Sequence, residues 1–131
     1  MQKQPLTVAI VEDHLLMRQC TQFRCSFLGY QVILEAENGQ RFLELLENAP
    51  VPDICLLDIN MPIMNGFETI VHLKKKYPGM KVVFLSMHDE QVYIKKSMDL
   101  GADGFIQKDA PVEVFKNLLQ ALSGQETVIA A

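Results

Sequence analysis

The chain has no tryptophan, three cysteines and only a small excess of acidic over basic residues. The odd number of cysteines (Cys20, Cys25 and Cys55), at spacings that match no zinc pattern, argues against a disulfide framework and a structural zinc site. We therefore expect three reduced thiols, with Cys55 in the core, in a cytoplasmic protein. The formal net charge of −4 disfavours direct nucleic acid contact, because phosphate binding needs a clustered basic surface.

Long apolar segments are missing as well. No run approaches the roughly 20 residues of a membrane span, and residues 1–5 lack the apolar stretch of a signal peptide. We therefore expect no membrane association. The 131 residues, 49% of them hydrophobic, are enough for a single domain with a core over about residues 6–123 and a short C-terminal tail.

Five short apolar segments, rich in valine, isoleucine and leucine, alternate with five segments of helical spacing. The predicted strands cover residues 6–11, 31–36, 54–57, 81–85 and 104–107. Strands that are apolar on both faces and alternate with helices form a parallel sheet covered on both sides. With right-handed crossovers, this predicts an α/β, flavodoxin-like (βα)5 doubly wound sheet with the strand order 2-1-3-4-5.

The predicted helices follow from apolar residues at helical spacing, and each ends at a glycine or proline. The expected core-facing residues are Leu16, Cys20, Phe23 and Phe27 in the first helix, Phe42, Leu45, Leu46 and Ala49 in the second, Ile94, Ser97 and Met98 in the fourth, and Val114, Phe115, Leu118, Leu119 and Leu122 in the fifth. The third helix covers roughly residues 67–77. The fourth has the weakest apolar pattern, which is typical of an element that can move.

Polar residues stand where the predicted strands end. Glu12 and Asp13 follow the first strand, Asp58 the third, Ser86 the fourth and Lys108 the fifth. Because parallel strands in register end at one edge of a sheet, we expect these side chains to meet there. Any one of them alone would be an ordinary loop residue. Their joint placement at the same end of several strands is hard to explain in that way.

Carboxylates gathered at one edge repel one another, so either a pKa rises or a cation binds. A hard cation that prefers oxygen ligands, Mg²⁺ or Mn²⁺, fits this set because no histidine or cysteine stands at a matching strand end. We predict that Asp13, Asp58 and the backbone carbonyl of Asn60 are metal ligands. Glu12 is longer and is expected to act through a bound water.

Lys108 and Ser86 extend this prediction to phosphate chemistry. A metal ion and an ammonium group on opposite sides of Asp58 would balance the oxygens of a transferring phosphoryl group, and the Ser86 hydroxyl would donate to a third oxygen. Asp58 would then be the nucleophile and form an aspartyl phosphate. We expect it to need no separate base, because a carboxylate is already ionised.

Taken in order, these residues resemble the receiver domains of two-component response regulators, from residue 8 to about residue 122. The motifs that carry the resemblance are Val11-Glu12-Asp13-His14, Leu57-Asp58-Ile59-Asn60-Met61-Pro62-Ile63-Met64-Asn65-Gly66, Leu85-Ser86-Met87-His88-Asp89 and Gly101-Ala102-Asp103-Gly104-Phe105-Ile106-Gln107-Lys108-Asp109. The residues after the fourth and fifth strands look most like the LuxR-type (NarL/FixJ-like) branch of this family.

The resemblance implies that a sensor histidine kinase or a phosphotransfer protein phosphorylates Asp58. It also implies that Ser86 and Phe105 are switch residues, that the Phe105 ring turns inward when Ser86 moves toward the phosphate, and that the face of helix four, strand five and helix five then changes shape. Homodimerisation on phosphorylation is a further expectation. The domain is not expected to be an enzyme beyond assisting its own phosphorylation and dephosphorylation.

Members of this branch usually carry a DNA-binding output domain, and none is present in this sequence. We expect residues 1–131 to be a single receiver domain excised from a transcription regulator. The alternative is a natural stand-alone receiver that acts only through protein contacts. The residue after Lys108 is Asp109 where many receivers have proline, so a cis peptide there would cost about 3 kcal/mol. His88 is a candidate influence on hydrolysis of the acyl phosphate.

Other functions are less compatible with the residues at the strand ends. A flavodoxin-type flavin binder needs a phosphate cradle after the first strand, where Glu12 and Asp13 would repel a phosphate. Phosphatases that resemble the haloacid dehalogenases place the nucleophile on the first strand, with a second aspartate two residues on, whereas here Asp58-Ile59-Asn60 follows the third. A degenerate receiver would lack some of the site residues, and all are present.

Overall fold

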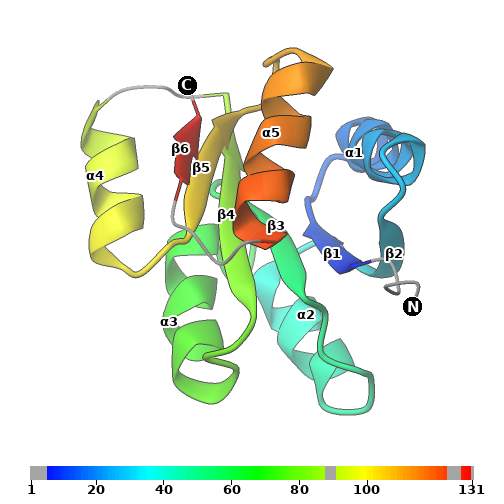
Figure 1. Ribbon diagram of the computed structural model, residues 1–131. Coiled ribbons are helices and arrows are strands. Elements are labelled where there is room, and N and C mark those ends of the chain that lie inside the picture. The colour runs from blue at the N-terminus through cyan, green and yellow to red at the C-terminus, as the bar shows by residue number, and fades with distance from the viewer. Residues whose placement is uncertain (1–5, 88–90, 124–127, 131) are drawn as a thin grey trace.

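The computed structural model describes residues 6–87, 91–123 and 128–130, the last three by their backbone only. One parallel sheet lies between two layers of helices (Figure 1). The strands are β1 (Thr7–Val11), β2 (Gln31–Ala36), β3 (Ile54–Asp58), β4 (Lys81–Ser86), β5 (Gly104–Gln107) and β6 (Val128–Ala130). The helices are α1 (Leu15–Phe27), α2 (Gly39–Leu46), α3 (Gly66–Lys76), α4 (Gln91–Asp99) and α5 (Val112–Ser123).

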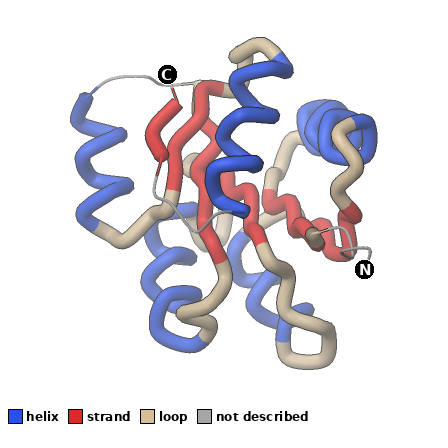
Figure 2. Tube along the Cα trace, in the orientation of Figure 1, coloured by secondary structure: helices blue, strands red, loops and turns tan. Residues whose placement is uncertain are grey.

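The strand order is β2-β1-β3-β4-β5-β6, and all neighbours are parallel. The predicted flavodoxin-like order of the first five strands is confirmed. The sixth strand was not predicted, because three residues of the C-terminal tail are too few for a periodic signal. Figure 2 shows the strands side by side, with β6 along the edge of β5.

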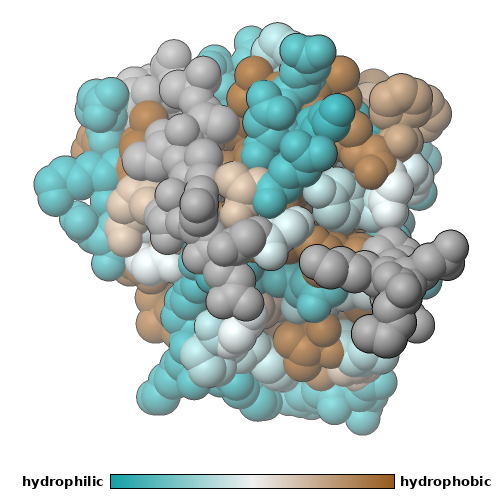
Figure 3. All heavy atoms as spheres, in the orientation of Figure 1, coloured by the Kyte–Doolittle hydropathy of each residue, from teal (hydrophilic) through white to brown (hydrophobic). Residues whose placement is uncertain are grey.

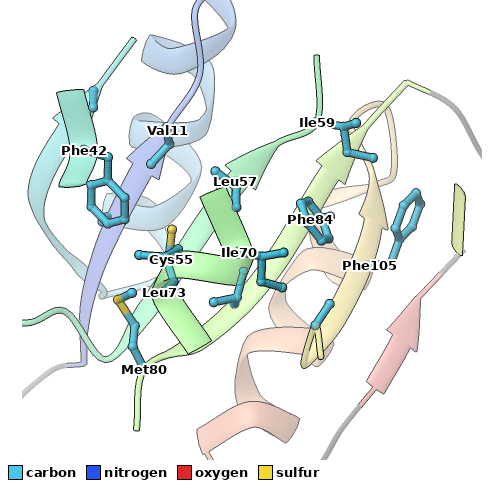
Figure 4. Close-up of a cluster of buried hydrophobic side chains, with 14 of the residues drawn as sticks. Val11, Phe42, Cys55, Leu57, Ile59, Ile70, Leu73, Met80, Phe84 and Phe105 are labelled. Atoms are coloured by element: carbon cyan, nitrogen blue, oxygen red, sulfur yellow. The ribbon is translucent and has the colours of Figure 1, made fainter. Parts of the chain in front are cut away.

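Each face of the sheet is covered by its own group of helices. Alternate residues of β3 illustrate this: Cys55 and Leu57 pack with α2, α3 and α4, whereas Ile54 and Leu56 pack with α5 and part of α1. The first of these clusters is drawn in Figure 4, where side chains of Phe42, Ile70 and Phe84 fill the space between sheet and helices. A strand buried on both faces explains why its sequence is a continuous apolar run.

The expected core stripe of α1 is wrong, although the helix itself is confirmed. Leu16 (62% exposed), Phe23 (69%) and Phe27 (72%) face solvent, and Cys20 is also exposed. Cys25 is the residue of this helix that is buried against the sheet. The helix carries apolar residues on more than one face, and periodicity alone does not tell which face turns inward. Figure 3 shows hydrophobic side chains at the surface over α1 and a hydrophilic outer face on α5.

The other helices pack as predicted in their main contacts. Phe42 and Leu46 of α2 are buried, as are Ile94 and Ser97 of α4. The buried residues of α5 are Phe115, Leu118, Leu119 and Leu122. All three cysteines are free thiols, as predicted, and burial raises the pKa of Cys25 to about 12. None of the helices within the described residues is long and apolar enough to cross a bilayer.

Candidate functional site

Sheet register brings the predicted site residues together. Val11 of β1 lies beside Leu57 of β3, so the residues that follow them in the chain, Glu12 and Asp58, are also neighbours. A carboxylate oxygen from each of Glu12, Asp13 and Asp58 lies within 4.8 Å of the other two. Glu12 and Asp58 are buried, whereas Asp13 is exposed. The predicted acidic cluster is therefore present at the carboxyl edge of the sheet.

Lys108 reaches the same cluster from the far side of β4. Ser86 pairs with Gln107 at the end of β4 and β5, and the Lys108 N–H donates to the Ser86 carbonyl at 2.8 Å. The Lys108 ammonium forms ion pairs with the Glu12 carboxylate and, at 3.2 Å, with Asp58 Oδ1. Its side chain is only 10% exposed. An ammonium group is thus held beside the proposed nucleophile, as expected from the sequence.

The protonation of Asp58 differs from the expectation. Burial raises the pKa of Asp58 to about 7, the Glu12 carboxylate adds to this shift and the Lys108 ammonium opposes it. We expected an ionised carboxylate, whereas the raised pKa favours the neutral form of Asp58 in the protein without a metal ion. The physical reason is that burial and the neighbouring Glu12 carboxylate both favour the neutral form of Asp58.

Glu12 and Lys108 are shifted in the opposite sense, toward their charged forms. Burial works to raise the pKa of Glu12, but hydrogen bonds with Lys108, Asp58 and the His14 N–H outweigh it and hold this pKa below its usual value. Burial works to lower the pKa of Lys108, but its bond to Glu12 and its proximity to Asp58 raise it instead. The site thus contains one firm ion pair and one carboxyl group that titrates near neutrality.

The Glu12–Lys108 ion pair was not predicted. That Glu12 acts on a metal through water stays a prediction, and in the structure its carboxylate also forms an ion pair with Lys108. The two residues are 96 positions apart, and only the folded geometry shows that Glu12 lies nearer to the Lys108 ammonium than Asp58 does. Arg18 supports this arrangement, because its guanidinium donates to the Glu12 carbonyl at 2.7 Å.

The loop after Asp58 is fixed by backbone contacts. The Ile59 N–H donates to Asp58 Oδ1 at 2.8 Å, and the Gly66 N–H donates to the Ile59 carbonyl at 2.8 Å. A Cβ atom on Gly66 would lie 2.2 Å from the Asp58 carbonyl oxygen, so only glycine allows α3 to start this close to β3. Asn65 and Glu68 form a capping box at the same helix end. These contacts fix the backbone around Asp58, and the Ile59 N–H holds one of its carboxylate oxygens.

The remaining predicted residues lie nearby. Ser86 is 1% exposed at the end of β4. Phe105 is also 1% exposed and lies with Phe84 in the core cluster, so its ring is already buried in this structure (Figure 4). Among the described residues no peptide bond is cis. His88 lies outside the described residues.

The donor set fits a hard divalent cation. Three carboxylates that offer oxygens within 4.8 Å of one another are the kind of ligands that Mg²⁺ and Mn²⁺ prefer. Burial of two of them leaves repulsion that a cation would relieve. Asn60 is exposed in the loop directly after this cluster, and its carbonyl stays a predicted ligand.

Comparison with known proteins matches this arrangement to one family. The sequence model of one protein family, the response regulator receiver domain, matches residues 8–120 of this chain. The chain is 34% identical over 125 residues to the nitrate/nitrite response regulator protein NarL of Escherichia coli, covering 94% of this chain and 57% of the relative. It is also 34% identical over 120 residues to the transcriptional regulatory protein DegU of Brevibacillus brevis, covering 88% of this chain and 50% of the relative. The chain thus spans about half the length of these relatives.

Solved structures agree with the fold. The signal receiver domain of the response regulator NarL from Mycobacterium tuberculosis is 29% identical, with a TM-score of 0.81 over 94% of this chain and 97% of that chain. One further relative, 36% identical over 111 residues, is a cyclic di-GMP phosphodiesterase of Thermotoga maritima, of which this chain covers 29%. The family match, the relatives and the strand order agree, and the chain belongs to the receiver domains of response regulators, in the LuxR-type branch.

Proposed function

We propose that Asp58 accepts a phosphoryl group from the phosphohistidine of a sensor histidine kinase or a phosphotransfer protein. The observation that carries this proposal is a 7% exposed carboxyl group with an ammonium at 3.2 Å and two further carboxylates within 4.8 Å. An Asp58 oxygen attacks phosphorus and the phosphorus–nitrogen bond breaks. The departing imidazole nitrogen keeps the electron pair and takes up a proton, and Asp58 becomes an aspartyl phosphate.

The charged groups at the site support both the attack by Asp58 and the binding of the phosphoryl oxygens. Lys108 is already positioned by Glu12, so its ammonium can pair with a phosphoryl oxygen on Asp58 without a large movement. Asp13, Asp58 and the Asn60 carbonyl would hold Mg²⁺ or Mn²⁺ in this proposal, with Glu12 acting through water. When bound, such a cation supplies positive charge that keeps Asp58 ionised and offsets the charge of the phosphoryl oxygens.

The signal would leave through Ser86, Phe105 and the face of α4, β5 and α5. Within the described residues of α4, only Ile94 and Ser97 are buried, so little apolar burial holds this helix. The Phe105 ring is already inside the core, so the switch in this proposal is a displacement of neighbouring elements, not an inward turn of the ring. Chemical shifts over residues 94–101 that stay unchanged on adding a phosphate mimic with Mg²⁺ would contradict it.

The output belongs to a longer protein in this proposal. This chain covers about half the length of its relatives, and these are named as a response regulator and a transcriptional regulatory protein. We therefore propose that this receiver controls a DNA-binding output in the cytoplasm, without itself contacting DNA or a membrane. Two features stay part of the proposal: homodimerisation on phosphorylation, and the absence of enzyme activity beyond the domain's own phosphorylation and dephosphorylation. A stand-alone receiver acting through protein contacts is the alternative.

Intact mass spectrometry tests the central claim. The chain is incubated with phosphoramidate and Mg²⁺, and we expect one added phosphate that is absent in Asp58→Asn and absent with a chelator. Asp99→Asn removes an exposed carboxylate on α4 and serves as the matched control, which should be labelled like the unmodified chain. Label on the Asp58→Asn variant would refute the assignment. Release of phosphate from a generic ester over many turnovers would favour a phosphatase instead.

A further inference from the structure

Arg24, in the last turn of α1, contacts the segment that leads from Lys108 into α5. Its guanidinium donates to the Ala110 carbonyl at 3.0 Å, across 86 positions of the chain. The first turn of α5 donates to the Pro111 carbonyl instead, so among the described residues Arg24 supplies the donor to Ala110. A hydrogen bond from a charged donor is stronger than one from a neutral donor, so this contact ties α1 firmly to the segment.

The bond lies at a packed contact between α1 and this segment. Ala110 is only 8% exposed and belongs to the same buried cluster as Cys25, the residue next to Arg24. The Ala110 N–H donates to the Gln107 carbonyl at the end of β5, at 3.0 Å. Ala110 is therefore held by its N–H, its buried methyl group and its carbonyl, and these contacts fix the backbone on the C-terminal side of Lys108.

The anchoring of this segment matters because Lys108 stands inside it. The Lys108 N–H donates to the Ser86 carbonyl at 2.8 Å, and its ammonium lies 3.2 Å from Asp58 Oδ1. A lysine side chain is a flexible four-carbon stem, so the position of its ammonium group depends on where the backbone is anchored. Arg18 of the same helix holds the Glu12 carbonyl. Helix α1 thus anchors the backbone of both partners in the ion pair between Glu12 and Lys108.

Helix electrostatics do not account for the contact of Arg24 with Ala110. A cation in the last turn of α1 interacts favourably with the negative end of that helix dipole, but this interaction needs no partner on another segment. The same guanidinium lies beside the positive end of α5, which begins two residues after Ala110, where a cation is unfavourable. What the bond does achieve is to fix the segment that carries Lys108.

We propose that Arg24 is a positioning residue for Lys108: it holds the segment after Lys108 so that the ammonium group stays beside Asp58 and meets a phosphoryl oxygen there. This inference rests on the proposed role of Asp58 as phosphoacceptor. Arg24 itself touches neither the phosphoryl group nor the predicted metal ligands, and it acts only through Lys108. Removing its guanidinium therefore slows phosphorylation only as long as the lysine is present.

A cycle of variants tests this role. Arg24→Met and Arg24→Gln remove the guanidinium but keep a long unbranched side chain that suits a helix. Each is made alone and together with Lys108→Ala, and circular dichroism checks that it is folded. Arg41→Met removes an exposed arginine of α2 and is the matched control. Labelling with phosphoramidate and Mg²⁺ is followed over hours by intact mass, and Mn²⁺ binding is measured by calorimetry.

We expect labelling to be about tenfold slower in both Arg24 variants and about 100-fold slower in Lys108→Ala, with no further loss when the two changes are combined. Mn²⁺ binding to the Arg24 variants should be unchanged or tighter, because a displaced ammonium no longer repels the cation. Arg41→Met should behave like the unmodified chain in both measurements.

Three results would overturn the inference. A second loss of similar size in the Lys108→Ala background would mean that Arg24 does not act through Lys108. Weaker Mn²⁺ binding, or an Arg24 variant that does not fold, would indicate a general structural role. Unchanged labelling of the Arg24 variants would mean that the contact has no part in the reaction. If phosphoramidate fails to label the unmodified chain, the proposed role of Asp58 fails instead.

Discussion

Replacing Asp58 by asparagine should stabilise the protein without a metal ion, and increasingly so as the pH rises. Asp58 has a pKa of about 7 in the folded chain, above the ordinary value of 3.8. Between these two values the folded state binds more protons than the unfolded state, so the stability of the unmodified protein falls as the pH rises and levels off above pH 7. The Asp58→Asn variant has no such group and lacks this loss.

The size of the effect follows from the shift. Each pKa unit corresponds to about 1.4 kcal/mol, so the full shift of Asp58 is worth about 4 kcal/mol at most. Part of that penalty is present at pH 5 already, and the exposure of Asp13 leaves the acidic cluster partly screened by solvent, which weakens the repulsion. We therefore expect the free energy of unfolding of Asp58→Asn, relative to the unmodified protein, to grow by about 1–2 kcal/mol between pH 5 and pH 8.

Urea unfolding followed by circular dichroism at pH 5, 6, 7 and 8 measures this difference. The experiment is run with a chelator and again with Mg²⁺. With the cation present at about 100 times its dissociation constant, the unmodified protein should gain about 2.7 kcal/mol at pH 8, whereas Asp58→Asn, which lacks one ligand, should gain less. Asp99→Asn removes an exposed carboxylate of α4, away from the acidic cluster, and is the matched control for the loss of one negative charge.

A difference between Asp58→Asn and the unmodified protein that stays constant or shrinks from pH 5 to pH 8 would refute the electrostatic reasoning. So would an equal gain from Mg²⁺ in both proteins. In either case the raised pKa of Asp58, or its place among the metal ligands, would have to be abandoned.

Three further substitutions test the parts of the fold that support the site. Gly66→Ala places a Cβ atom 2.2 Å from the Asp58 carbonyl oxygen, so we expect a loss of about 2 kcal/mol in urea unfolding together with slower phosphorylation; normal values of both would contradict the close approach. Lys74 forms an ion pair with Asp103 at 2.6 Å, and the Asp103 side chain is only 14% exposed. Asp103→Ala leaves Lys74 without this partner, so we expect the free energy of unfolding to fall by about 2–3 kcal/mol, whereas breaking an exposed pair would change it little. Ile63→Asn should raise stability by about 0.5–1 kcal/mol by relieving the φ of +68° at Ile63, in the loop before α3, and lower stability would show that this loop is not strained.

Most of the fold could be predicted from local sequence patterns. The buried strands are continuous apolar runs, and the residues that interrupt them, such as Glu12 and Asp58, mark where strands end. Because parallel strands bring like ends together, the position of a residue at a strand end was enough to predict which side chains share the site. The confirmed proximity of Lys108 to Asp58 follows from this rule.

Other features needed the tertiary structure. The apolar residues of α1 lie on more than one face, and only packing against the sheet decided that Phe23 and Phe27 stay outside. The three-residue β6 gains its hydrogen bonds from the edge of β5, which no local pattern records. These are contacts between distant segments, and their energies do not appear in the periodicity of either segment alone.

At the site, too, some properties follow from the sequence and others only from the tertiary structure. The sequence by itself determined which charged groups meet, because strand ends and parallel pairing place Glu12, Asp58 and Lys108 together. Only the tertiary structure decided how the charge is shared: Glu12 pairs with Lys108, and Asp58 is left with a pKa of about 7. Burial and distances of a few ångströms set these protonation states, and they exist only once the chain is folded.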